Sequence, residues 1–116
     1  LSWPVAKHIN QYYSWYHPAI DLGGSYGTPI YAASAGTVVD AKKQTYSFGW
    51  YCIIDVGDNI TVAYAHMSDL ACSVGQSISR GQYIGAIGTS GRATGPHLHL
   101  EVRQNGKGID PLSLLN

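Results

Sequence analysis

Short runs of β-branched and aromatic residues recur along this chain, and each run is soon interrupted by Gly, Pro, Asn or Asp. Almost no segment shows the 3.6-residue period of an amphipathic helix. Short apolar runs separated by turn residues are typical of antiparallel β-proteins. We therefore predict an all-β fold with a compact antiparallel β-sheet or sandwich core. At 116 residues the chain is long enough for one hydrophobic core, so we expect a single domain over residues 1–116.

The clearest hairpin has strands at 50–56 and 60–66, joined by a turn at Gly57, Asp58 and Asn59. Only the short stretch 67–71 is compatible with a helix, of about one turn. The other predicted strands are 29–32, 36–42, 83–89 and 97–104.

Charge and hydropathy exclude two classes of partner. Lys plus Arg number seven and Asp plus Glu number seven, so no long-range field attracts nucleic acid. No apolar run approaches the roughly 20 residues that span a bilayer, so we expect no membrane insertion by this chain. The sequence begins at Leu1 rather than Met, and we expect a piece of a longer precursor.

Two cysteines, Cys52 and Cys72, lie twenty positions apart, which excludes a Cys-x-x-Cys pair. In an oxidising compartment we expect them to form a disulfide, which would stabilise the fold by about 3 kcal/mol. Two buried free thiols are the alternative.

The segment from Gly95 to Val102 carries the strongest chemical signal. Alternate side chains of a strand point to opposite faces, so His97, His99 and Glu101 share one face and apolar residues share the other. Two imidazoles on one polar face indicate a shared small partner, either a metal ion or a proton in transit. For an isolated pair of this kind, a structural role is the alternative.

Two further elements carry histidines at predicted strand ends or turns. His66 ends the second hairpin strand, where alternation places it on one face with Val62 and Tyr64. His17 and Asp21 flank a Pro18-Ala19 turn that could bring an imidazole and a carboxylate together, as a zinc site requires. Each element alone has a structural explanation, but four of the five histidines fall in these three elements. Their combination favours one shared site.

The ordered set of these motifs resembles the lysostaphin-type, or LytM-like, family of peptidoglycan metalloendopeptidases. Its marks are an H-x-x-x-D element, here His17 to Asp21, and a later H-x-H element, here His97 to His99. The resemblance covers nearly the whole chain. Ala19 stands where glycine is more usual, which removes no ligand. The other matching segments are Trp3-Pro4-Val5, Tyr64 to Ser68, Gly75-Gln76, Gly81-Gln82, Gly88 to Gly91, Gly95-Pro96 and Asp110-Pro111-Leu112.

The resemblance implies one Zn²⁺ per domain, held by His17, Asp21 and His99, with His66 and His97 as a catalytic pair that does not ligate the metal. It implies the family's β-sheet core of the duplicated hybrid motif type, with loops that wall a groove. The substrates it implies are stem peptides or cross-bridges of peptidoglycan, at an extracytoplasmic location. We expect a monomer.

Loop residues near the predicted site are candidates for binding substrate. They are Tyr46, Trp50, Tyr51 and Arg92, with ordinary surface or core roles as the alternative. Two other functions are weighed against the peptidase. A metal-free relative would keep the fold as a cell-wall-binding or regulatory module. A phosphocarrier-like domain would share the glycine-punctuated β pattern of 27–39 and 74–85 and relay a phosphoryl group through a pair of histidines, but it leaves Asp21 and the additional histidine unexplained.

Overall fold

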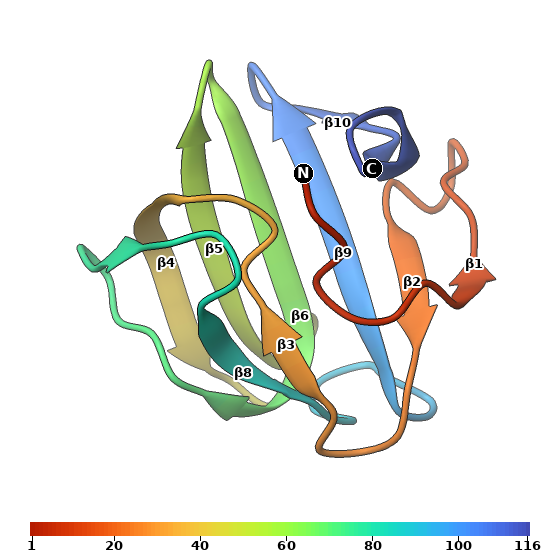
Figure 1. Cartoon of the computed structure of the whole chain (residues 1–116). Helices are drawn as coiled ribbons and strands as arrows, with labels where there is room; N and C mark the ends of the chain where they lie inside the picture. The colour runs from red at the N-terminus through yellow and green to blue at the C-terminus, as the bar shows by residue number, and fades with distance from the viewer.

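The computed structural model describes residues 1–116 and is built almost entirely of antiparallel strands, which confirms the predicted all-β fold (Figure 1). The only helical element is the 3₁₀ turn η1 (Pro111–Ser113), and no helix could span a membrane. The strands are β1 (Ile9–Gln11), β2 (Ile20–Gly23), β3 (Pro29–Tyr31), β4 (Gly36–Lys43), β5 (Trp50–Gly57), β6 (Ile60–Leu70), β7 (Ser77–Ile78), β8 (Tyr83–Ile87), β9 (His97–Gln104) and β10 (Lys107–Ile109).

The main sheet has the strand order β1-β2-β9-β6-β5-β4-β7. Strand β9 therefore lies between β2 and β6, although the three are far apart in sequence. Strand β10 pairs with β9, and β3 pairs with β8, which also pairs with the end of β6. In Figure 1, β3 and β8 cross in front of the long strands, and the core lies where these elements meet.

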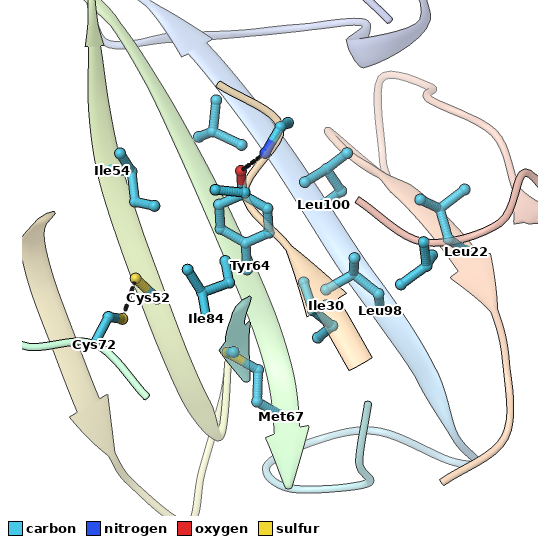
Figure 2. Packing of buried hydrophobic residues seen from close by; sticks show 14 of the residues in the cluster. Leu22, Ile30, Cys52, Ile54, Tyr64, Met67, Cys72, Ile84, Leu98 and Leu100 are labelled. Atoms are coloured by element: carbon cyan, nitrogen blue, oxygen red, sulfur yellow. Dashed lines mark hydrogen bonds between the residues drawn. The ribbon is translucent and has the colours of Figure 1, made fainter. Parts of the chain in front are cut away.

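Period-two alternation assigns the two faces of the sheet. Leu98, Leu100 and Val102 of β9 are fully buried in the core, whereas His97 and His99 point to the opposite face. Tyr64 lies in the middle of this packing, and its hydroxyl accepts a hydrogen bond of 2.9 Å from the Ala33 backbone N–H (Figure 2). Packing of the core face therefore fixes the position of β9, and with it His97 and His99 on the opposite face.

The β5–β6 hairpin is confirmed, with Asp58 and Asn59 at φ values of 55° and 60° in its two-residue turn. Positive φ at both positions gives a turn whose twist matches that of the flanking strands. Strand β9 has the bounds predicted for it. The stretch 67–71, which the sequence leaves compatible with one helical turn, forms no helix, because β6 continues to Leu70 and pairs there with β8.

The structure does not show the expected disulfide. Cys52 and Cys72 are both buried free thiols, and their sulfurs are 2.6 Å apart (Figure 2). A disulfide bond is about 2.05 Å long. Both sulfurs pack in the hydrophobic core.

Candidate active site

Strands β2 and β9 bring Asp21 and His99 together as directly paired residues. Ile20 and Leu22 on either side of Asp21 are fully buried, so alternation turns the carboxylate to the opposite face. There His99 Nδ1 lies 3.2 Å from Asp21 Oδ1. The pairing that builds the sheet therefore also builds this part of the site.

His17 joins the pair from the turn that precedes β2. The Ala19 N–H donates to the His17 carbonyl at 2.8 Å, which reverses the chain tightly around Pro18. His17 Nε2 then lies 3.4 Å from Asp21 Oδ2. The structure thus places the imidazole and carboxylate together, as the Pro18-Ala19 turn suggested.

The three side chains form a donor set that suits a tetrahedral zinc ion. One donor atom from each of His17, Asp21 and His99 can be chosen so that all lie within 4.8 Å of one another. Ligand bonds of about 2.0–2.2 Å in tetrahedral geometry place neighbouring donors about 3.3–3.6 Å apart. The two distances to the carboxylate, 3.2 Å from His99 Nδ1 to Asp21 Oδ1 and 3.4 Å from His17 Nε2 to Asp21 Oδ2, are close to that spacing but end on different oxygens. Two imidazoles and a carboxylate are ligands that zinc binds, so these residues fit Zn²⁺.

A second carboxylate fixes the orientation of His99. Glu101 is buried, and its Oε1 lies 3.1 Å from His99 Nε2. Arg103 donates to Glu101 Oε2 from Nε at 3.2 Å and from Nη2 at 3.0 Å. Because Glu101 can hold a proton on Nε2, it leaves the Nδ1 lone pair for a metal.

The ionisable groups at this corner stabilise one another. Burial alone would raise the pKa of Asp21, but the hydrogen bond from His99 and the charges of His97, His99 and His17 outweigh it and lower that pKa. Burial opposes protonation of His99, yet its hydrogen bonds to Asp21 and Glu101 raise the pKa of His99 to about 9. Each carboxylate thus carries negative charge next to His99.

His66 reaches the same site by way of a β-bulge. Cys52 pairs with Tyr64 but Trp50 pairs with Met67, so β6 holds one residue more than β5 in this interval. His66 itself has a left-handed φ of 62°. Its N–H donates to the Phe48 carbonyl at 2.7 Å, which helps to hold this strained backbone.

Because of the bulge, the predicted orientation of His66 is wrong. Regular alternation puts His66 on one face with Val62 and Tyr64, which lie in the core. Instead the extra residue turns the imidazole to the opposite face, where its ring centroid is 5.1 Å from that of His97 and 5.5 Å from that of His99.

Backbone carbonyls set the tautomers of His66 and His97. His66 Nδ1 lies 2.7 Å from the Ser90 carbonyl and His97 Nδ1 lies 2.9 Å from the Gly95 carbonyl. A carbonyl oxygen only accepts, so each Nδ1 carries a proton and Nε2 of a neutral ring is left as a base. Burial lowers the pKa of His66, with smaller contributions from His97 and His99, which favours its neutral form.

All five predicted polar residues line one groove of about 410 Å³, with Arg92 at its exposed side. Tyr46 is exposed and does not line it, whereas Trp50 lines a neighbouring pocket beside Ser90. Tyr51 is buried and donates to Asp40 at 2.7 Å. The remaining residues of the groove wall are Gln11, Ser47, Phe48 and Thr94.

Sequence reasoning missed one residue of the site, Phe48, and gave another, Glu101, no role. Phe48 packs its ring 5.5 Å from that of His99, but no local pattern marks it, because it comes from a loop. Glu101 could have been identified, since its position two residues after His99 already placed it on the same face of the strand.

This geometry can be compared with known proteins. Residues 6–111 match the profile of peptidase family M23. The chain belongs to this family. A sequence relative is the peptidoglycan DD-endopeptidase ShyA of Vibrio cholerae, which is 38% identical over 109 residues. The match covers 94% of this chain but 24% of ShyA, so the chain spans about a quarter of that relative.

Solved structures agree with the family assignment. A zinc-containing peptidase from Vibrio cholerae superposes with a TM-score of 0.87 at 30% identity, over 93% of this chain and 37% of that one. The catalytic domain of lysostaphin from Staphylococcus simulans gives a TM-score of 0.75 at 29% identity, over 96% of this chain and 85% of that one. The resemblance to the lysostaphin-type family is therefore confirmed, and the fold is of this type.

Proposed function

We propose that this M23 chain is a zinc-dependent endopeptidase that hydrolyses peptide bonds in the stem peptides or cross-bridges of bacterial peptidoglycan. The observation that carries the proposal is the convergence of five polar side chains in one groove, three of them with donor atoms within 4.8 Å of one another. The name of the relative ShyA supports the substrate class.

In this proposal His17, Asp21 and His99 hold the ion through Nε2, a carboxylate oxygen and Nδ1. When bound, Zn²⁺ supplies a Lewis acid that polarises the scissile carbonyl and activates water near neutral pH. Glu101 acts as a positioning residue, because its hydrogen bond to Nε2 keeps the His99 ring turned with Nδ1 toward the other two ligands.

His66 and His97 perform the proton transfers. Each ring holds its Nδ1 proton against a backbone carbonyl, so the Nε2 of a neutral ring can take the proton of the attacking water. The resulting imidazolium returns that proton to the departing amine. The lowered pKa of His66 keeps this imidazole neutral, and hence basic, near pH 7.

Arg92 adds a positive charge to the groove wall and is itself exposed. Arg92, Tyr46 and Trp50 stay proposals as substrate-binding residues. Peptidoglycan lies outside the cytoplasmic membrane, so we place the protein in an extracytoplasmic compartment. We propose that residues 1–116 act as one monomeric domain.

Zinc content and hydrolysis, measured on the same purified variants, test these roles. His99→Ala and Asp21→Ala are expected to lose stoichiometric zinc, because each removes a ligand. His66→Ala and His97→Ala are expected to keep zinc but lose about 10²–10⁴-fold in turnover. Full zinc occupancy in His99→Ala would refute the ligand assignment, and a zinc-free wild type without hydrolysis would favour the inactive binding module.

A further inference from the structure

An exposed aromatic turn lies directly before the proposed ligand His17. Trp15 and Tyr16 are its two central residues, closed by backbone hydrogen bonds of 2.9 and 3.1 Å between Ser14 and His17. Their rings meet edge to face with centroids 5.4 Å apart. The Tyr13 hydroxyl donates to the Gly108 carbonyl at 3.0 Å, which attaches the segment to β10. The rings are thus carried on an anchored turn.

The fold gives no reason for aromatic residues at this place. Trp15 is 92% exposed and Tyr16 is 69% exposed, so neither ring contributes much buried apolar area to stability. Two-residue turns favour Gly, Asn and Asp instead. Tyr12 is also 62% exposed and extends the same segment. We call Tyr12, Trp15 and Tyr16 the aromatic turn.

The aromatic turn is continuous with the groove. Gln11 and His17, which bracket it in sequence, both line the groove wall. In Figure 1 the connection from β1 to β2 forms a loop beside β2 at the β1 end of the sheet. The aromatic turn thus lies between two residues of the groove wall in sequence, so a polymer that leaves the groove on this side lies close to the segment that carries these rings.

The chemistry of the aromatic turn favours a neutral ligand. Residues 9–16 contain no Lys, Arg, Asp or Glu. Tyr and Trp rings present apolar faces with a polar edge, and pyranose rings present apolar C–H faces with hydroxyl edges. In peptidoglycan the stem peptides carry free carboxylates, whereas the glycan strand is the largely uncharged, ring-shaped part.

The distances are also compatible with such a ligand. Trp15 is two residues from His17, which an extended chain spans in at most about 7 Å, and its side chain adds several ångströms. An extended peptide of three residues spans about 10 Å. A stem peptide whose bond lies at the proposed catalytic groups can therefore have its sugar end near the aromatic turn.

We propose that Tyr12, Trp15 and Tyr16 bind the glycan strand of peptidoglycan by stacking, and so hold its attached peptide in the groove. This inference rests on the proposed function, since the groove is taken to hold the peptide. It makes the aromatic turn a determinant of substrate choice: substrates with sugars are preferred over the same peptides without them.

Two substrates with the same cross-linked peptide, one carrying glycan chains and one without sugars, test the preference. For Trp15→Ala we expect the ratio of kcat/KM between glycan-bearing and glycan-free substrate to fall about tenfold, with zinc content retained. The matched control is Tyr31→Ala, which removes a 45% exposed ring from another edge-to-face pair, with Tyr83 on β3 and β8, and should leave the ratio unchanged.

Equal loss on both substrates would overturn the proposal, because it would mean that Trp15 acts only through the neighbouring His17. An unchanged ratio would also overturn it, as would a change of oligomeric state in Trp15→Ala, which would identify a second copy as the occupant.

Binding of peptide-free N-acetylglucosamine oligomers, followed by NMR, gives a readout that does not depend on hydrolysis. The wild type should show shifts in the aromatic turn that Trp15→Ala abolishes, and absence of such shifts in the wild type would contradict the proposal. If the wild type binds the sugars but cleaves neither substrate, only the proposed function fails.

Discussion

Replacement of Glu101 by Ala tests the positioning role of this buried carboxylate. The change removes the acceptor 3.1 Å from His99 Nε2, so the imidazole loses the contact that fixes its orientation and its tautomer. Removal of such a hydrogen-bond partner of a metal ligand typically lowers metal affinity 10–100-fold, or about 1.4–2.7 kcal/mol. We expect zinc affinity to fall by this factor, as measured by competition with a chromogenic chelator.

Two variants separate orientation from charge. Glu101→Gln retains an oxygen that can accept from Nε2, so its affinity should fall less than that of Glu101→Ala. Arg103→Ala removes a side chain that is 54% exposed and leaves the His99 contact in place, so zinc affinity should stay near wild type. Circular dichroism controls for folding. If Glu101→Ala binds zinc as tightly as the wild type, the positioning role is refuted.

Three further predictions concern pH, a loop glycine and the core. The pKa of His99 is raised to about 9, so below that pH zinc must displace a proton from His99 to bind. Zinc affinity should therefore rise by up to about tenfold per pH unit between pH 6.5 and 8.5. Zinc titrations that give the same affinity across this range would contradict the prediction. Gly91 has a φ of 72°, and a Cβ at this position would lie 2.3 Å from the Gly49 nitrogen, so Gly91→Ala should lower both kcat/KM and Tm. Gly106 has a similar φ of 79° but no atom within 4 Å of a Cβ placed there, so the control Gly106→Ala should lower kcat/KM far less. Tyr64→Phe should reduce the free energy of unfolding by about 1–3 kcal/mol in urea, because the buried Ala33 N–H loses its acceptor, and an unchanged midpoint would refute that assignment.

The sequence predicts well those parts of the fold in which period-two alternation coincides with burial. Strand β9 is the clearest example, since its apolar residues face the core and its histidines face away. The β5–β6 turn can also be predicted from the sequence, because Asp58 and Asn59 readily adopt the positive φ that the turn requires. The pairing of Asp21 with His99 needs the order of the strands in the sheet, which no local pattern contains.

The failures have local physical causes. The bulge that turns His66 away from the core is one extra residue in β6, and its sequence looks like regular alternation. The stretch 67–71 is compatible with a helical turn by sequence, but pairing with β8 extends β6 through most of it. Short strands such as β7 exist because a neighbour offers hydrogen-bonding partners, and two residues carry no periodic signal.

The most direct test of the account is digestion of purified cross-linked peptidoglycan, with products identified by mass spectrometry. The zinc-loaded protein should convert cross-linked muropeptides into fragments with one new amine and one new carboxylate at a peptide bond. Removal of the metal by chelation should stop the reaction, and added zinc should restore it. Intact cross-links after treatment with folded, zinc-loaded protein, or cleavage that persists without metal, would contradict the account.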